Sequence, residues 1–343
     1  MAEGVLDASG AQAPLGEAEP VFVQMTRHPQ PSLAWGVGVS SAWGVVHDRL
    51  GDPDQTPGAF VNLGRLARRG APPAVIDLAG ARLMREVNVA DVADLMLARG
   101  GYQEIERIEV RSLSGLSADS LASRTLDGRR WALRSLVRKD GDMAFLLRMR
   151  CAWEDLERLA GEFARAAQSF VLLDPSLGDF AEPLVEFTLL APTPMRFDAP
   201  LSWERHDRPL GPEGGDGLLL INRLAQRACG QIVVVGFPEE AVSGAEALSQ
   251  ALLARAFGAG FTGAIPALES VDNIGGLALK TWRMRVDGDL QGKPVRLDAT
   301  LMALPAGWVS VLVWGPSPQG HPEIEAVNRR AYEIVLQSLR VGR

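Results

Sequence analysis

The side chains that most often carry acid–base or metal chemistry are sparse in this sequence. Its four histidines are His28, His47, His206 and His321, and no two are four residues apart as in a helical zinc site. His206 precedes Asp207, an order that suits a carboxylate orienting a general base, yet no serine or cysteine lies in a nucleophile-elbow sequence. We therefore predict no catalytic residues, no metal site and no cofactor.

One glycine cluster matches the dinucleotide-binding pattern G-x-G-x-x-G, as Gly258-Ala-Gly-Phe-Thr-Gly263. That pattern binds a pyrophosphate only when a strand precedes it and a helix follows it, and here the order is reversed. We interpret it as a helix stop. A second cluster, residues 211–217, lacks the Gly-Lys-Ser/Thr ending of a phosphate loop and is predicted to be a turn.

A basic run and two cysteines complete the candidate chemistry. The basic residues are Arg129, Arg130, Arg134, Arg138 and Lys139. They could bind an acidic partner, but alternating basic side chains on a strand more often form its solvated face, which is the interpretation we favour. The cysteines, at positions 151 and 229, are too few for a disulfide framework and have strand-like neighbours that suggest burial.

Length and composition indicate a globular protein of two domains. The chain has 343 residues, 47% of them hydrophobic and 22% charged, and no apolar run approaches the ~20 residues of a membrane-spanning helix. A net charge of −7 argues against general nucleic-acid binding, which depends on basic residues. The amino terminus shows no secretory signal, so we expect a cytoplasmic protein that does not insert into membranes.

The elements of the chain follow one plan twice. In each copy three strand-like runs precede an amphipathic helix, and the later helix begins at Pro322, a residue that suits the first helical position. The predicted strands are 118–126, 130–139 and 142–151 in the earlier copy, and 276–287, 293–304 and 308–315 in the later one. The predicted middle helices are 89–99 and 244–256, the second with a capping box from Ser243 to Glu246.

Short sequence matches support a tandem duplication. The segment Arg65-Leu-Ala67 matches Arg223-Leu-Ala225, Leu121–Thr125 matches Leu277–Thr281, and Gln168-Ser-Phe170 matches Gln337-Ser-Leu339. We predict a flexible leader (1–31), a first domain (32–175), a linker (176–191) and a second domain (192–343). Each domain is expected to be α+β, a mainly antiparallel sheet with flanking helices.

The strands before the matched Arg-Leu-Ala segments are predicted to bind an apolar partner. Alternation in a strand places Val61 with Leu63 on one face, and Leu219 with Ile221 on one face. If these faces are open, the four side chains can bind an apolar helix of a client protein. Burial between the two domains is the alternative, and both interpretations remain open from the sequence.

These features resemble the PsbP-like fold, and in particular the DcrB family. The resemblance rests on Trp43 and Trp203 after short strands, on the strands at Arg65 and Arg223, and on the Gln-Ser-Phe and Gln-Ser-Leu helix ends. It covers nearly everything after residue 32. The first copy departs from it at Gly36-Val-Gly-Val, where the second has Met195-Arg-Phe-Asp-Ala-Pro200.

The resemblance also implies a function. The family includes lipoproteins and the Eag-type chaperones, bacterial cytosolic proteins that hold apolar transmembrane segments of type VI secretion effectors. This sequence shows no lipidated amino-terminal cysteine, so the chaperone branch is favoured. We therefore expect a non-enzymatic protein-binding protein. The alternatives are an enzyme with a cleft between its domains and a scaffold or regulatory protein of the same fold.

Overall fold

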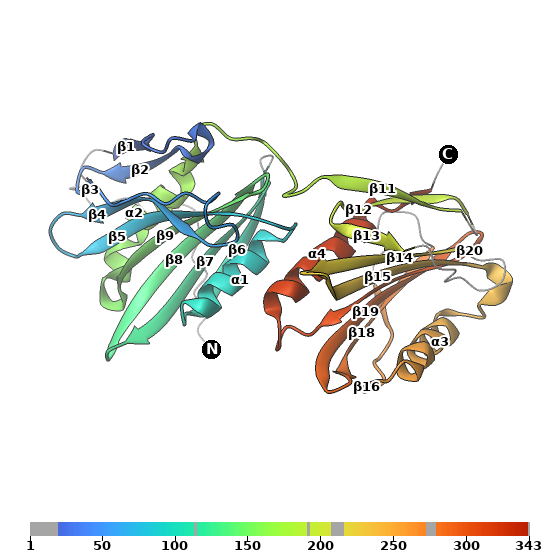
Figure 1. Ribbon diagram of the computed structural model, residues 1–343. Coiled ribbons are helices and arrows are strands. Elements are labelled where there is room, and N and C mark those ends of the chain that lie inside the picture. Colours follow the sequence, from blue (N-terminus) through green and yellow to red (C-terminus); the bar gives the residue numbers. More distant parts are fainter. Residues whose placement is uncertain (1–19, 113–114, 191–192, 207–215, 272–278, 342–343) are drawn as a thin grey trace. The chain divides into compact units, whose positions relative to one another are not determined.

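A computed structural model describes residues 20–112, 115–190, 193–206, 216–271 and 279–341. Strands account for 51% of the chain and helices for 22%. The chain forms two compact units (Figure 1). The first contains Met1–Leu83 and Met96–Asp179, and the second contains Met84–Leu95 and Phe180–Arg343. Four predictions lie partly outside the described residues. They concern the leader at residues 1–19, the turn at residues 211–215, Asp207 of the His206-Asp207 pair, and Leu277 and Ala278 of the Leu277–Thr281 match.

The first unit is built on one antiparallel sheet of seven strands. Their spatial order is β3-β4-β5-β9-β8-β7-β6. The strands are β3 (Trp43–Val46), β4 (Val61–Arg68), β5 (Ala74–Arg82), β6 (Gln103–Ser112), β7 (Gly115–Leu126), β8 (Arg129–Asp140) and β9 (Met143–Ala152). The last three agree with the predicted strands to within about three residues at each end.

The second unit has a sheet of the same strand order. Its path is β13-β14-β15-β20-β19-β18-β16, and β17 also pairs with β18. The strands are β13 (Trp203–His206), β14 (Asp216–Leu224), β15 (Arg227–Pro238), β16 (Phe261–Gly263), β17 (Glu269–Val271), β18 (Lys280–Leu290), β19 (Lys293–Leu304) and β20 (Gly307–Pro316). The repeated order agrees with the expected plan, and the duplication itself stays a prediction.

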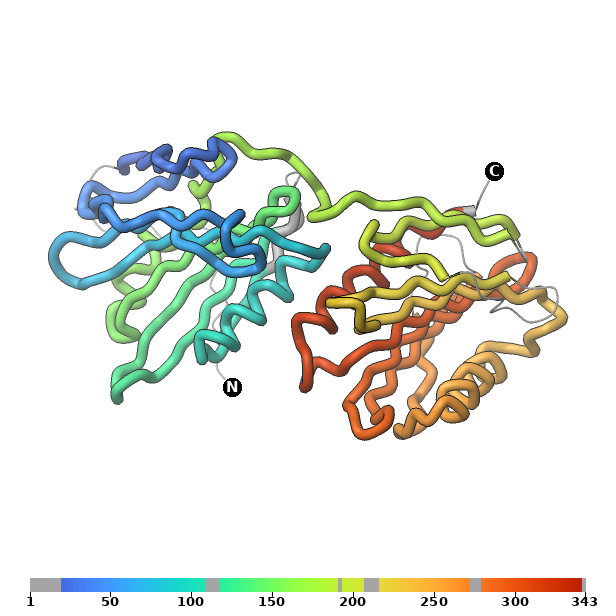
Figure 2. The backbone as a smooth tube through the Cα atoms, viewed as in Figure 1, coloured from blue at the N-terminus to red at the C-terminus, as the bar shows by residue number. Residues whose placement is uncertain are grey.

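A small three-stranded sheet accompanies each large one. The first has the order β1-β2-β10 and the second β11-β12-β21, so strands from the two ends of each unit lie side by side (Figure 2). The strands are β1 (Pro20–Met25), β2 (Trp35–Ser40), β10 (Val171–Leu172), β11 (Leu184–Leu189), β12 (Met195–Pro200) and β21 (Arg340–Val341). The expectation of a leader without order up to residue 31 was therefore wrong for β1, which pairs with β2 along its whole length.

Four α-helices and three short 3-10 helices are present among the described residues. The α-helices are α1 (Val89–Arg99), α2 (Leu156–Ser169), α3 (Ala245–Gly258) and α4 (Pro322–Ser338), and the 3-10 helices are η1 (Pro31–Leu33), η2 (Trp153–Asp155) and η3 (Glu239–Ala241). The helix α1 has the predicted bounds. The predicted capping box of α3 was wrong. The N-cap residue is Gly244, so Ser243 lies one residue before the capping position, and no side chain caps the helix.

The helices α2 and α4 each cover one face of a large sheet. Phe163 of α2 is fully buried against the strands of the first unit, and Val335 of α4 is fully buried against those of the second. The two helices end in the same way. The Ser169 hydroxyl accepts a hydrogen bond from the backbone N–H of Gly38 at 2.7 Å, and the Ser338 hydroxyl accepts one from that of Asp198 at 2.8 Å. The matched Gln-Ser positions of the sequence are therefore also matched in their contacts.

A buried amide fixes α4 onto its sheet. The Asn328 side chain is 3% exposed, accepts a hydrogen bond from Asn222 Nδ2 at 3.0 Å and donates one to the Cys229 carbonyl at 2.9 Å. It occupies the space left by two glycines. A Cβ added at Gly230 would lie 2.2 Å from an Asn328 atom, and one added at Gly315 would lie 2.4 Å away.

We expect Asn328→Ala to destabilise the second unit by about 2–4 kcal/mol, because it leaves buried polar groups unpaired and opens a cavity. Urea unfolding followed by fluorescence measures the change. The control is Gln337→Ala on the exposed side of the same helix, where the expected change is below about 0.5 kcal/mol. Equal stabilities of the two variants would contradict the assignment.

Candidate functional site

The four residues predicted to form an apolar groove do not share one environment. Leu63 is 2% exposed and belongs to the core beneath α2, and Val61 packs half-buried against the same core. Leu219 and Ile221 are 9% and 7% exposed and lie on the opposite face of β14 from the core residues Leu218 and Leu220. An open groove lined by all four side chains is therefore not what the structure contains.

The physical reason is a shift in strand register. The opening tryptophan Trp43 lies opposite Arg68, whereas Trp203 lies opposite Asn222. Arg65 lies three residues before Arg68, and Leu219 lies three residues before Asn222, so Arg65 and Leu219 are equivalent. The Arg-Leu-Ala match had instead aligned Arg65 with Arg223. A bulge between Asn62 and Gly64 further changes which side chains of β4 face the core.

The equivalent faces of the two large sheets differ in chemistry. In the first unit a row of directly opposed residues crosses five strands and is entirely polar; we call it the polar row. It consists of Arg65, Asp77, Arg148, Ser135 and Ser120. Asp77 of this row lies between the core residues Ile76 and Leu78, whose side chains face α2. Alternation along the strand therefore places the polar row on the opposite face of the sheet.

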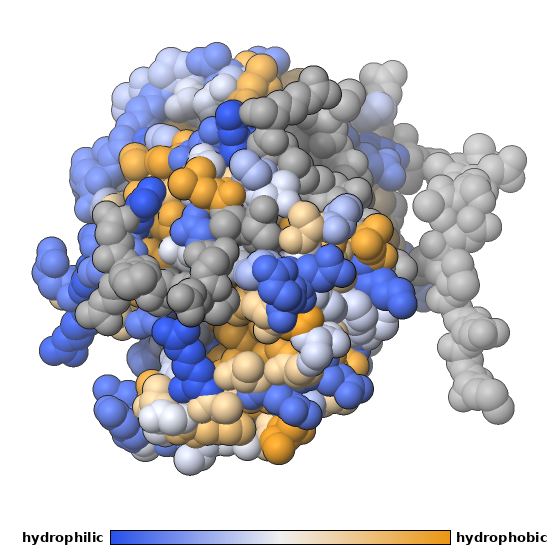
Figure 3. Space-filling view, turned by 90° about the vertical axis from the view of Figure 1, so that its right-hand side faces the viewer, coloured by the Kyte–Doolittle hydropathy of each residue, from blue (hydrophilic) through white to orange (hydrophobic). Residues whose placement is uncertain are grey.

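In the second unit the same row is entirely apolar. It consists of Leu219, Val233, Leu312, Ala299 and Met284, which we call the apolar row. The α3 helix packs on its β18 and β19 end, and Val233 and Leu312 stay half-buried. Hydrophobic residues reach the surface of this unit in the lower half of Figure 3.

Aromatic side chains extend the face of the apolar row. Trp282 and Trp308 stack with ring centroids 5.6 Å apart, and the Phe261 ring lies 5.5 Å from that of Trp314. All four residues alternate with the α4-side core residues of their strands and so share the face of α3. Phe261 is fully buried, whereas the three tryptophans are half-buried, and large aromatic groups of that kind provide much of the contact area in protein interfaces.

Asp77 organises the polar row. It is fully buried, and it accepts Arg148 Nε at 2.6 Å and Arg150 Nη2 at 2.7 Å, one on each carboxylate oxygen. Arg65 pairs with Asp48 at 3.0 Å. Burying the carboxylate of Asp77 in a strand without such partners would cost free energy of folding. The two arginines of β9 provide the positive charges that Asp77 needs.

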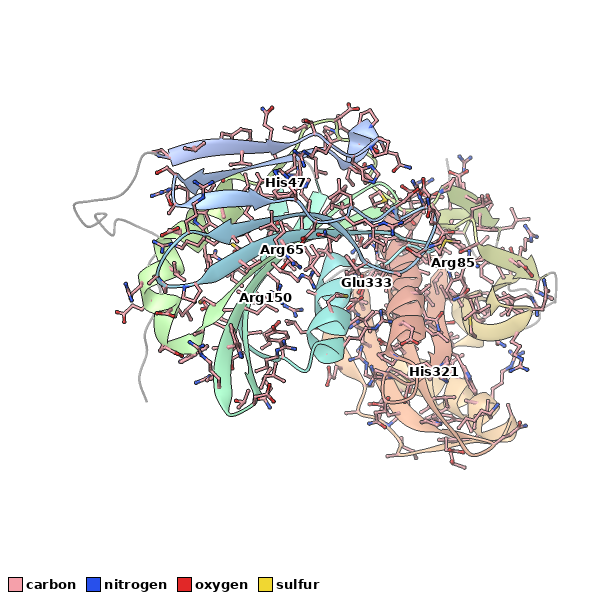
Figure 4. All side chains as sticks on the ribbon, turned by 60° about the vertical axis from the view of Figure 1, so that its left-hand side comes forward. His47, Arg65, Arg85, Arg150, His321 and Glu333 are labelled. Carbon is pink, nitrogen blue, oxygen red and sulfur yellow. The ribbon has the colours of Figure 1, made fainter. Side chains whose placement is uncertain are left out.

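Two of these arginines are paired through their outer nitrogens, because Arg65 binds Asp48 through Nη1 and Arg150 binds Asp77 through Nη2. The side chains of Arg65, Arg148 and Arg150 are 37%, 32% and 33% exposed. The Nε atoms of Arg65 and Arg150 are buried and have no hydrogen-bond acceptor. Both residues lie on the first sheet (Figure 4), on the two strands that flank β5. The arrangement offers planar donor groups to an acceptor ligand.

The predicted basic run forms a different surface. Arg134 pairs with Asp119 at 2.6 Å, Arg129 pairs with Glu154 at 2.8 Å, and the guanidinium carbon of Arg130 lies 3.6 Å from the Trp153 ring centroid. These cations already have partners in the fold. Binding of an acidic partner by this run is therefore not favoured by the structure.

Sequence analysis missed the cluster around Asp77 because its members are far apart in the chain.

The second unit also contains a cavity of about 540 Å³ between α4, β18 and the segment around β17. Its lining mixes cations and carboxylates, including Arg283, Glu269 and Arg285, the last paired with Asp298 at 2.5 Å. The Tyr332 hydroxyl bonds to the Thr300 hydroxyl at 2.6 Å, and burial raises the pKa of Tyr332. A charged lining of this kind is unsuited to an apolar helix.

Reactive groups are not apparent among the described residues. Burial raises the pKa of Cys151 to about 11 and also raises the pKa of Cys229, so neither thiol is readily ionised. No group of three His, Cys, Asp or Glu residues in the described part of the chain could hold a metal ion. Burial raises the pKa of Asp91 to about 7 despite its bond to Arg329, yet Asp91 lies beside no nucleophile in the described contacts.

Comparisons with known proteins give distant structural similarities only. No protein-family model and no curated protein matches the sequence. The solution structure of cyanobacterial PsbP (CyanoP) from Synechocystis sp. PCC 6803 aligns over 48% of this chain and 98% of its own, with 10% identity and a TM-score of 0.35.

Two structures from type VI secretion align over a larger part of the chain. The apo immunity protein TplEi from Pseudomonas aeruginosa aligns over 81% of this chain and 94% of its own, with 13% identity and a TM-score of 0.25. A chain of the Tle4–Tli4 complex gives the same coverages and TM-score at 12% identity. TM-scores below 0.5 establish neither a shared fold nor a function. No helix among the described residues is both long and apolar enough to cross a membrane.

Proposed function

We propose that this protein is a non-enzymatic binding protein whose partner is another protein. The observation that carries the proposal is the contrast between the polar row and the apolar row. Two sheets of the same strand order present opposite chemistry on the same face, so the chain provides two different binding surfaces. A polypeptide with a charged segment and an apolar segment matches both of them.

The chemistry of the polar row suits binding and does not suit catalysis. Arginine stays protonated at every physiological pH, so it cannot accept a proton from a substrate. Asp77 is fully buried and each of its oxygens accepts an arginine hydrogen bond, which suits a structural ion pair better than a general base that must reach a substrate. These observations favour a binding protein over the alternative of an enzyme.

The finer form of the proposal is a cytosolic chaperone that holds an apolar transmembrane segment of a type VI secretion effector. The apolar row and its aromatic neighbours support an apolar client, since burying such side chains against a helix contributes about 1.5–3 kcal/mol for each fully buried one. Leu219 and Ile221 stay in this proposal as members of the same face. Val61 and Leu63 do not, because they lie on the core side of the first sheet.

Partner capture from the native host tests the proposal. We expect Val233→Asp to abolish capture of a specific partner, because a charge on the apolar row would have to be desolvated against hydrocarbon. The matched control is Gln226→Asp, which adds the same charge at an exposed position in the turn between β14 and β15. Circular dichroism establishes that both variants are folded, and quantitative mass spectrometry measures the captured partner.

Capture that is unchanged in Val233→Asp would exclude the apolar row as the binding surface. Capture that is lost equally in both variants would indicate a general charge effect instead. Only loss in the first variant with retention in the second supports the proposal.

A further inference from the structure

The partly exposed arginines on the face of Asp77 define a candidate binding site. The Nε donors of Arg65 and Arg150 are buried without a partner, although buried donors in folded proteins are almost always satisfied. About a third of each side chain is exposed, and one outer nitrogen of each arginine already pairs with Asp48 or Asp77. Both arginines project from the same face of the sheet, on the two strands that flank β5, so their remaining donors can be offered to one oxygen ligand.

The local charge defines what kind of ligand fits. Three arginines and two carboxylates, Asp48 and Asp77, give 3 − 2 = +1. One negative charge balances this cluster, whereas a phosphate with about two charges would face repulsion from both aspartates. The net charge of the whole chain, −7, also disfavours a polyanion such as nucleic acid.

We propose that Arg65 and Arg150 bind the side-chain carboxylate of an aspartate or glutamate in an acidic segment of the protein partner. Asp48 and Asp77 act as positioning residues, because they pair with Arg65 and Arg150 respectively. The identity of the carboxylate as part of a protein rests on the function proposed above. The carboxylate site itself rests only on the geometry of the cluster.

The second unit shows what the same positions look like without such a site. The equivalents of Arg65 and Arg150 are Leu219 and Trp314, because Val75 opposes Arg150 where Gln231 opposes Trp314. Leu219 offers no donor at all, and Trp314 has only its indole N–H. The proposed site therefore belongs to the first unit alone.

The test uses a fluorescein-labelled hexaglutamate peptide and fluorescence anisotropy at low ionic strength. We expect the wild-type protein to bind the peptide and the double variant Arg65→Gln with Arg150→Gln to bind about tenfold more weakly or worse. This variant leaves Asp77 paired with Arg148, so the fold should be retained, which circular dichroism checks. The matched control, Arg129→Gln with Arg158→Gln, removes two exposed cations from the same unit and should keep wild-type affinity.

A second variant keeps the test decisive if the glutamine variant fails to fold. Arg65→Lys with Arg150→Lys keeps the charge but loses the planar fork, and we expect it to weaken binding as well. Equal losses in the cluster variant and in the control variant would overturn the proposal, as would unchanged binding in both. Stronger competition by inorganic phosphate than by acetate would overturn the assignment to a carboxylate.

Failure of this inference is distinguishable from failure of the proposed function. If the glutamine variant loses the peptide but still captures the partner, the carboxylate site exists but the partner does not use it. If the peptide does not bind the wild-type protein at all while partner capture depends on Val233, the carboxylate site is wrong and the proposed function stands.

Discussion

Leu63→Asp should unfold the first unit. Leu63 is 2% exposed in the core beneath α2, and the packing around it is tight, since a Cβ added at Gly80 would lie 2.5 Å from its Cδ1 atom. An aspartate there would be an unpaired buried charge and would also remove apolar contacts. The expected loss, about 4 kcal/mol or more, is a large part of a typical domain stability of about 5–15 kcal/mol.

Circular dichroism and the one-dimensional proton spectrum of the variant measure this effect. The control is Ile108→Asp, which places the same charge at an exposed position, 54% accessible, on β6 of the same sheet. We expect the control to change the melting temperature little. A folded, cooperatively melting Leu63→Asp protein would contradict the assignment of Leu63 to the core and would restore the groove at this position.

Asp77→Ala should also destabilise the first unit strongly. Removing this buried carboxylate leaves Arg148 and Arg150 beside each other without their shared counter-ion, and breaking a buried ion pair in this way costs about 3–5 kcal/mol. Because both arginines are a third exposed, solvent reduces the penalty and we expect about 2–4 kcal/mol. Urea unfolding of the first unit gives the value.

Asp48→Ala is the matched control for that measurement. Asp48 also pairs with an arginine, but its side chain is 36% exposed, so the expected change is at most about 1 kcal/mol. Similar effects of the two substitutions would mean that Asp77 does not organise the polar row.

Much of the strand and helix pattern could be predicted from the sequence. An amphipathic helix was predicted after the three strands of the earlier copy, and α2 lies there with Leu159, Phe163 and Ala166 buried on one face. The sequence predicted a strand at 308–315, and β20 lies in the interior of the large sheet between β15 and β19. Periodicity predicts such elements well because the burial of each face depends on local spacing.

Strand register could not be predicted in the same way. The similar letters of Arg65-Leu-Ala67 and Arg223-Leu-Ala225 suggested an equivalence that backbone pairing does not support. A single bulge or a shift in pairing moves side chains to the other face without changing the apolar pattern. The placement of Leu63 with Ile221 on one surface failed for this reason.

One signal for the polar row was present in the sequence. Asp77 interrupts the otherwise apolar run Ala74–Ala79, and Arg148 and Arg150 alternate with apolar residues in a predicted strand. An isolated carboxylate in a buried strand requires a partner, so a search for arginines at alternating strand positions would have found this cluster. Its pairing across β5 and β9 still needed the structure.

The central claim is that equivalent faces of the two units bind chemically different segments of one protein partner. Its most direct test places the photoreactive residue p-benzoylphenylalanine at Val75 or at Gln231, which are equivalent positions beside the polar row and the apolar row. After cross-linking in the native host, mass spectrometry identifies the attached peptides. We predict an acidic segment at Val75 and an apolar segment of the same partner at Gln231. Attachment of the same kind of segment at both positions, or of no protein at either, would contradict the claim.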